Sequence, residues 1–177
     1  GGVALGEIEG VPPVWMTTRV GFDAHLVEAA LAAGAADHTG RPVAEVEPDV
    51  PAIRFRDGDR LTAPLIVGAD GATSVVARAL YGTPFDPARI GFALEVEAPP
   101  SETLEEAPVR IDFGAADWGY GWSFPKSGST TVGVGGLHAR NPAMKTAMHA
   151  YMDLLDVDPD RVKVQGAFLP FGDVRRV

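Results

Sequence analysis

Cysteine is absent from this chain of 177 residues, and lysine is scarce, with only three among the fifteen basic residues. Without cysteine the chain can hold no disulfide framework, no thiolate nucleophile and no cysteine-based metal site. The formal net charge is −9, and an acidic surface repels phosphate backbones, so we expect no nucleic-acid partner. The four histidines lack the spacing of metal ligands, and we expect no metal site.

Long apolar runs are also missing. No stretch approaches the ~20 apolar residues that a membrane-spanning helix needs, and no secretory signal is visible. We therefore expect a cytoplasmic protein. Glycine and proline are frequent instead, at 21 and 15 residues, which favours many turns and short strands over a helical bundle.

The spacing of apolar residues predicts two helices and a series of short strands. Apolar positions at helical intervals predict one helix over 22–33 and a second that begins near Asn141-Pro142. The continuous apolar run Leu65-Ile66-Val67 predicts the end of a strand that is buried on both faces. Among the expected strands are 43–46, 52–56, 60–67, 90–97, 109–113 and 162–168.

The most informative stretch is 120–136, which reads YGWSFPKSGSTTVGVGG. Tyr120, Trp122 and Phe124 alternate, so the three rings should share one face of a strand. Aromatic stripes most often belong to an ordinary core. Periodicity alone therefore favours a half-buried core strand over a binding surface.

The same stretch predicts a hairpin. Pro125 has no N–H to donate, so we expect it to end the strand or to force a bulge. Ser127-Gly128 supplies the turn, and Thr130–Val134 is the return strand. We expect Lys126, at the hairpin tip, to be solvated.

A glycine-rich turn, Gly68-Ala69-Asp70-Gly71, precedes a short helix that Thr73 or Ser74 can cap. A strand, a tight turn and a helix N-terminus together form the geometry of many nucleotide sites. The two glycines permit close approach to a ligand, and the carboxylate can accept a hydrogen bond from a hydroxyl or a water. An ordinary glycine-rich turn between a strand and a helix explains the pattern equally well.

These motifs together resemble a known family. Tyr-x-Trp-x-Phe-Pro, followed after seven residues by Gly133, resembles the signature of the geranylgeranyl reductases. The segment 68–74 with Arg78, and the segment 19–23, resemble flavin-side motifs of the aromatic-hydroxylase-like flavoproteins, the superfamily that includes these reductases. The resemblance implies that FAD is held by Arg19, Gly68, Ala69, Asp70, Gly71 and Arg78, and that substrate is contacted by Tyr120, Trp122, Phe124 and Pro125.

The resemblance also implies an architecture and an activity. We expect an α+β or mixed α/β fold, with a partial FAD-binding domain at 1–88 and a β-rich substrate-binding domain, covered by a helix, at 89–177. The family reduces alkene bonds of isoprenoid chains with a hydride from N5 of reduced flavin. The implied electron donor is NAD(P)H or a ferredoxin-like protein. Any association with a membrane would come through the substrate alone. No residue is assigned as the catalytic proton donor.

The Gly-x-Gly-x-x-Gly loop of such flavoproteins does not occur in the 177 residues. We therefore expect the chain to match the middle portion of a family member, to form one side of a shared FAD pocket and to be inactive alone. Two alternatives stay open. One is a flavin monooxygenase of the same superfamily, and the other is a non-catalytic module that binds a hydrophobic ligand or a partner without flavin.

Overall fold

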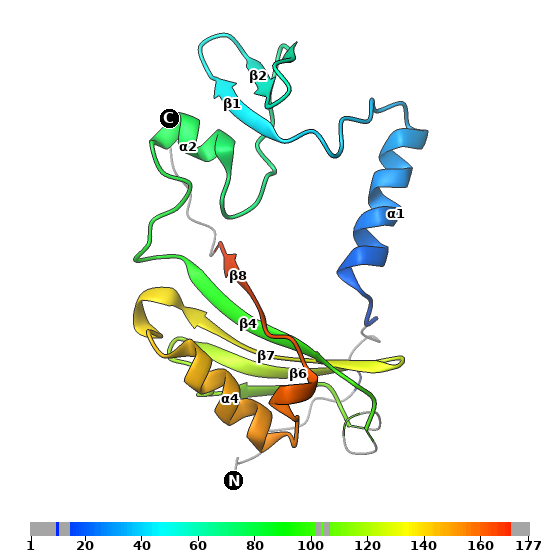
Figure 1. Cartoon of the computed structure of the whole chain (residues 1–177), viewed down its shortest axis with the longest axis vertical. Helices are drawn as coiled ribbons and strands as arrows, with labels where there is room; N and C mark the ends of the chain where they lie inside the picture. Colours follow the sequence, from blue (N-terminus) through cyan, green and yellow to red (C-terminus); the bar gives the residue numbers. More distant parts are fainter. Residues whose placement is uncertain (1–9, 11–14, 102–103, 105–106, 171–177) are drawn as a thin grey trace.

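The computed structural model describes residues 10, 15–101, 104 and 107–170, and Figure 1 shows how their helices and strands are arranged. Within these ranges no helix is both long enough and apolar enough to cross a membrane. In chain order the elements are α1 (Arg19–Ala32), β1 (Val43–Glu47), β2 (Ala52–Phe55), β3 (Arg60–Thr62), α2 (Val75–Tyr81), β4 (Gly91–Ala98), β5 (Arg110–Phe113), β6 (Gly119–Lys126), β7 (Ser129–Leu137), η1 (His138–Arg140), α4 (Met144–Leu154), η2 (Pro159–Arg161) and β8 (Gln165–Leu169).

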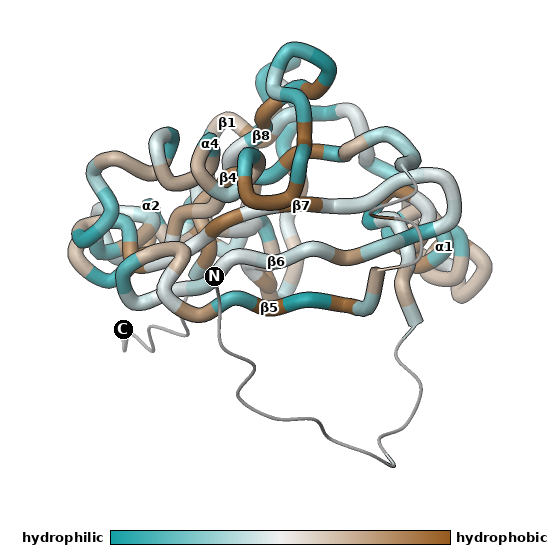
Figure 2. The backbone as a smooth tube through the Cα atoms, turned by 90° about the horizontal axis from the view of Figure 1, so that it is seen from below, coloured by the Kyte–Doolittle hydropathy of each residue, from teal (hydrophilic) through white to brown (hydrophobic). Residues whose placement is uncertain are grey.

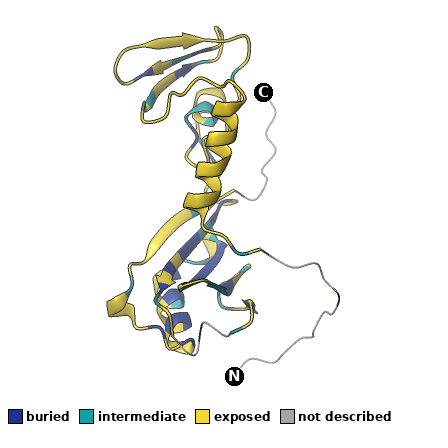
Figure 3. Cartoon of the chain, turned by 90° about the vertical axis from the view of Figure 1, so that its right-hand side faces the viewer, coloured by how far each residue is buried: buried dark blue, intermediate teal, exposed yellow. Residues whose placement is uncertain are grey.

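Helix α1 confirms the predicted helix over 22–33 and begins earlier, at Arg19. The reason is Thr18, whose side chain accepts a hydrogen bond from the Gly21 N–H at 3.2 Å and caps the helix. None of the 14 described residues of α1 is buried, and Figure 3 shows the helix exposed along its whole length. Its apolar side chains, such as Phe22 at 49% exposure, therefore contribute little to the core.

The smaller sheet has the order β1-β2-β3 and is antiparallel throughout. The Asp-Gly turn at 57–58 joins β2 to β3, as the hairpin signal predicts. The predicted buried strand end at Leu65–Val67 is wrong. Strand β3 stops at Thr62, and Leu65 and Val67 are 74% and 77% exposed. No described strand pairs with this run, so its backbone has no ladder to join.

The larger sheet has the order β5-β6-β7-β4-β8, again antiparallel throughout, and Figure 2 shows β5, β6 and β7 side by side. Helix α4 packs on one face of it, as Figure 1 shows. Its methionines Met148 and Met152 are fully buried against Val132 and Val134 of β7. This arrangement confirms the predicted mixed α/β fold with a sheet covered by a helix. The division into domains at residue 88 stays a prediction.

A partly buried polar contact joins α4 to the edge of this sheet. The Tyr151 hydroxyl donates a hydrogen bond of 2.7 Å to the Asp112 carboxylate, which also accepts from Arg110. Tyr151 is 3% exposed. Burial, together with the neighbouring Asp112 carboxylate, raises the pKa of Tyr151 well above its usual value, so the phenol stays protonated and keeps donating.

Two expectations for the hairpin need correction. Strand β6 continues through Pro125 to Lys126 in regular register, with Pro125 opposite Thr130 and no bulge. Proline is tolerated because β5 pairs with β6 only as far as Ser123, so one side of β6 has no ladder at Pro125. Lys126 is not solvated: its side chain is 11% exposed because it pairs with Glu97. The turn at Ser127-Gly128 is confirmed.

Candidate functional site

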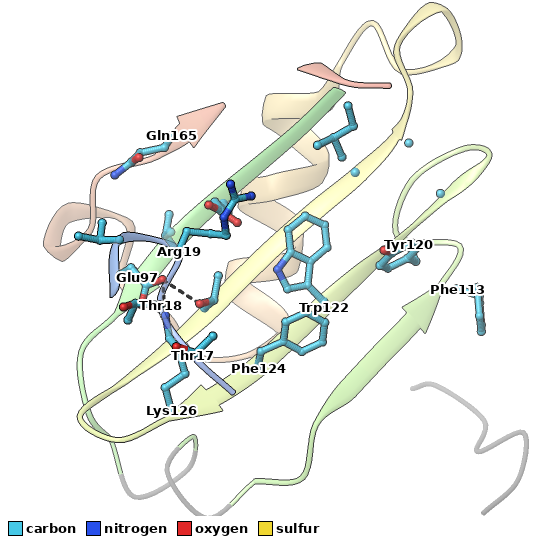
Figure 4. Close-up of a pocket in the computed structure, with 18 of the residues that line it drawn as sticks. Thr17, Thr18, Arg19, Glu97, Phe113, Tyr120, Trp122, Phe124, Lys126 and Gln165 are labelled. Carbon is cyan, nitrogen blue, oxygen red and sulfur yellow. Dashed lines mark hydrogen bonds and ion pairs between the residues drawn. The ribbon is translucent and has the colours of Figure 1, made fainter. Parts of the chain in front are cut away.

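A cavity of about 1010 Å³ lies on the face of the larger sheet opposite α4. On β4, the cavity-lining Glu95 and Glu97 alternate with the core residues Leu94, Val96 and Ala98, because side chains of a strand point to opposite faces in turn. Thr17–Val20, where the chain enters α1, borders the cavity on one side. Figure 4 shows this segment together with the rings of β6.

Strand β6 supplies an aromatic wall. Tyr120, Trp122 and Phe124 all line the cavity, which confirms that the three rings share one face. The ring centroids of Tyr120 and Trp122 are 5.8 Å apart, and those of Trp122 and Phe124 are 6.3 Å apart. Phe113 of β5 extends the row, with its ring 6.5 Å from that of Tyr120. Contacts at these spacings hold each ring in place.

Strand β7 supplies a floor of glycines beside this wall. Trp122 lies opposite Gly133, and Tyr120 lies opposite Gly135. A Cβ built on Gly133 would come within 2.3 Å of Trp122 Cζ2, so only glycine leaves room for the indole there. The hairpin register therefore explains why seven residues separate the Phe-Pro pair from Gly133.

Strand β4 supplies an acidic wall across the floor. Glu95 pairs with Gly133, and Glu97 pairs with Thr131. Both glutamates line the cavity. Since neighbouring strands lie ~4.8 Å apart, the backbones of the two walls are on the order of 10 Å apart. The site is thus a trough with rings on one side, glycines below and carboxylates on the other side.

One end of the trough holds a hydrogen-bonded ion pair. Lys126 Nζ lies 2.8 Å from Glu97 Oε1, and the Thr131 hydroxyl donates to the same oxygen at 2.8 Å. The Ser129 hydroxyl donates to Glu97 Oε2 at 3.0 Å. Burial raises the pKa of Glu97, but these hydrogen bonds outweigh it and hold the pKa below its usual value. Glu97 is therefore ionised at neutral pH.

Sequence reasoning missed this polar end. Glu97 and Lys126 are 29 positions apart, and only the antiparallel order β6-β7-β4 brings them together. One signal was available, because Glu95 and Glu97 alternate within the predicted strand 90–97 and must share a face.

Arg19 is the predicted cofactor residue that lies in the trough. It lines the cavity at the start of α1 and is highly exposed. Its guanidinium forms an ion pair with Asp23, at 2.8 Å between Nη2 and Oδ2. The remaining predicted cofactor residues, all of them among those described, do not line this cavity: Gly68, Ala69, Asp70, Gly71 and Arg78.

The Asp70 carboxylate caps the N-terminus of α2. It accepts hydrogen bonds from the Ser74 hydroxyl, from the Val75 N–H at 2.6 Å and from the Val76 N–H at 3.3 Å. Burial raises the pKa of Asp70, but these donors outweigh it and lower the pKa below its usual value. Ser74 in turn accepts from the Ala77 N–H at 2.8 Å, which confirms the predicted cap.

The two glycines of this turn have different environments. A Cβ on Gly68 would lie 2.8 Å from the Cβ of Val76, so Gly68 lets the turn pack against α2. Gly71 has a φ of +78° and open space around its Cα, which suits a close approach of a ligand to the backbone. The assignment of the turn to FAD stays a prediction.

Comparison with known proteins places the fold. No family model and no curated protein matches this chain. Among solved structures, 85% of the chain superimposes on a tryptophan halogenase from Shewanella frigidimarina, with a TM-score of 0.61 and 15% identity, and covers 30% of that protein. A flavin-dependent halogenase from Brevundimonas, BrvH, matches 83% of the chain with a TM-score of 0.60 and 23% identity, over 31% of its length.

A third similar structure is a geranylgeranyl bacteriochlorophyll reductase-like protein from Thermoplasma acidophilum. It matches 85% of the chain with a TM-score of 0.60 and 21% identity, over 41% of its length. The described residues therefore have the fold shared by flavin-dependent halogenases and this reductase-like protein, as the resemblance to the flavoproteins predicts. The chain spans 30–41% of the length of these three proteins.

Proposed function

We propose that this chain forms the substrate-binding part of a FAD-dependent oxidoreductase that reduces alkene bonds of an isoprenoid chain. The observation that carries the proposal is the trough, in which the rings of Tyr120, Trp122 and Phe124 stand beside the glycine floor of β7. Rings offer wide apolar area with little rotamer freedom to lose, which suits a long, flexible hydrocarbon. The likeness to the reductase-like protein supports this choice at the level of the fold.

The residues of the chain hold and shield the hydrocarbon in this scheme. The aromatic wall of β6 holds the hydrocarbon against the floor. The absence of side chains at Gly135 and Gly136, which line the cavity, lets the hydrocarbon lie close to the sheet. Removing water from the reacting alkene and orienting it are the two contributions that such a surface makes.

The turn at 68–71 is suited to one side of a FAD site. It is exposed, and Gly71 leaves its backbone open to a ligand. Since the Asp70 carboxylate is already used to cap α2, we propose that the backbone of the turn and the guanidinium groups of Arg19 and Arg78 contact the cofactor. Reduced FAD, when bound, supplies the hydride, and NAD(P)H or a ferredoxin-like protein supplies the electrons.

The test is an alkene-reduction assay on the full-length gene product that contains this chain, with FAD, dithionite and a geranylgeranyl substrate. Mass spectrometry should show a gain of one H₂ for each alkene reduced. Trp122→Ala should lower the rate, and the control Trp15→Ala, at a tryptophan that is 88% exposed and outside the cavity, should not. A flavin-loaded protein that leaves every alkene intact would contradict the proposal.

A second candidate is flavin-dependent oxidation of an aromatic or polyketide substrate, as in a monooxygenase. The likeness to two halogenases, one of them flavin-dependent by name, favours it, and a flat ring could stack on the same wall. Substrate-dependent oxygen consumption would support this candidate over the reductase. A full-length protein without flavin absorbance would instead support a non-catalytic module that binds a hydrophobic ligand.

A further inference from the structure

The polar end of the trough continues the aromatic row. Lys126 follows Phe124 on the same face of β6, so Tyr120, Trp122, Phe124 and Lys126 all line one side of the cavity. At ~3.3 Å per residue, the distance along β6 from Tyr120 to Lys126 is about 20 Å. An apolar groove of this length that ends on one ion pair is suited to an amphiphile with a polar group at one end.

The hydrogen bonds at this end leave both a donor and an acceptor available. Glu97 Oε1 accepts from Lys126 and Thr131, whereas Oε2 accepts only from Ser129 among the described residues. A carboxylate has about four acceptor positions, so one remains on Oε2. The Lys126 ammonium has three donors and uses one of them on Glu97 within the described part of the chain.

The charges at this end select the type of polar group. Glu97 neutralises Lys126, and Glu95 adds a second carboxylate to the same wall. The other cation that lines the cavity, Arg19, is paired with Asp23. A phosphate head would therefore meet the carboxylates of Glu95 and Glu97 with only Lys126 to oppose them. A plain hydrocarbon would cover the ion pair and take its remaining hydrogen-bonding groups out of water without replacing them. A neutral hydroxyl can donate to Glu97 and accept from Lys126 at once.

We propose that Glu97 and Lys126 bind the hydroxyl head of a long-chain isoprenoid alcohol, with its tail running over Phe124, Trp122 and Tyr120. This inference rests on the proposed function and narrows its substrate to an alcohol. The polar end then fixes the position of the isoprenoid along the trough, because the bound head group determines which alkene of the tail lies beside each ring.

The test is equilibrium binding to the full-length protein of three probes with the same tail: geranylgeraniol, its methyl ether and geranylgeranyl phosphate. The ether keeps the oxygen but cannot donate to Glu97. Since a hydrogen bond to a charged group is lost, the alcohol should bind about tenfold more tightly than the ether. The phosphate should bind more weakly than the alcohol.

Variants of Glu97 and Lys126 test whether the ion pair binds the hydroxyl head of the alcohol. Lys126→Met should weaken the binding of the alcohol and of the ether alike, because both oxygens accept from the ammonium, whereas Glu97→Gln should reduce the preference for alcohol over ether to less than about twofold. The matched control Lys145→Met, at an exposed lysine on α4 outside the cavity, should keep it. Glu97→Gln keeps the size of the side chain, so it carries the test if Lys126→Met does not fold.

Different failures separate this inference from the proposed function. If the ether binds as tightly as the alcohol, or the phosphate binds more tightly, the head-group assignment is wrong and the aromatic trough can still be an isoprenoid site. If none of the three probes binds, the proposed function and this inference fail together.

Discussion

Replacing Gly133 by alanine tests the architecture of the trough. The new Cβ would lie 2.3 Å from Trp122 Cζ2, 2.6 Å from Trp122 Cε2 and 2.8 Å from the Leu94 carbonyl oxygen. The first two contacts require the indole to move off the floor, and the third requires a shift of β4. Overpacking of this kind costs about 1–3 kcal/mol of unfolding free energy.

Gly135→Ala is the milder variant with which Gly133→Ala is compared. Its Cβ would lie 3.1 Å from the Cβ of Ala93 and 3.4 Å from Trp122 Cζ3, so small movements of these neighbours relieve it. We expect a loss of less than about 1 kcal/mol for this variant. Urea unfolding followed by far-UV circular dichroism measures both losses, and near-UV circular dichroism reports the displaced indole.

A double variant separates the effect of the clash with the Trp122 indole from that of the clash with strand β4. Combining Gly133→Ala with Trp122→Ala removes the clash with the indole but keeps the contact with the Leu94 carbonyl. The two changes should therefore couple favourably, by about 0.5–3 kcal/mol, relative to the sum of the single variants. A Gly133→Ala protein with wild-type stability and an unchanged near-UV spectrum would refute the placement of Trp122 on the glycine floor.

Three further changes test the contacts around the trough and at α2. Tyr151→Phe should cost about 1.5–3 kcal/mol in urea unfolding because Asp112 loses the hydrogen bond from the buried Tyr151 hydroxyl. The control Tyr120→Phe, at a hydroxyl with no partner among the described residues, should change the stability by less than about 0.5 kcal/mol. Equal losses in the two variants would contradict the Tyr151–Asp112 hydrogen bond. Ser74→Ala should cost about 1 kcal/mol because the cap of α2 is lost, and an unchanged midpoint would count against the cap. The pKa of Asp70 is lowered in the folded protein, so its stabilisation is present at neutral pH and is lost as the pH falls below about 4. Asp70→Asn should flatten the acid limb of the stability–pH curve, and an identical limb would contradict the assigned hydrogen bonds.

Local pattern predicted much of the fold because the deciding interactions are local. The alternation of Tyr120, Trp122 and Phe124 fixed their common face, and the hairpin register followed from the Ser127-Gly128 turn. The apolar spacing of α4 predicted the buried face that covers the larger sheet. Each of these depends on neighbours within one strand, one turn or one helix.

The errors depend on partners that are distant in sequence. The run at Leu65–Val67 is apolar enough for a buried strand, yet a strand needs a neighbour, and none pairs with it in the described residues. Lys126 is at a hairpin tip, where solvent is the usual environment, but Glu97 of β4 lies within 2.8 Å of its ammonium. Pro125 stays within a regular strand because β5 stops short of it.

The candidate site was predicted in part for the same reason. The aromatic wall is a property of one strand and was found, whereas the glycine floor and the acidic wall come from β7 and β4 and needed the sheet order. Among the predicted cofactor residues, Arg19 lies in the trough, and the turn at 68–71 lies outside the residues that line it. The sequence motifs alone did not show this separation.

The most direct test of the central claim is photo-crosslinking with a geranylgeranyl probe that carries a diazirine in its tail, followed by peptide mapping of the labelled protein. If the trough is the isoprenoid site, the label should fall on β6 between Tyr120 and Lys126, and excess geranylgeraniol should compete it away. Label concentrated on the outer face of α1, on Leu65–Val67 or on α4, with β6 unlabelled, would contradict the account.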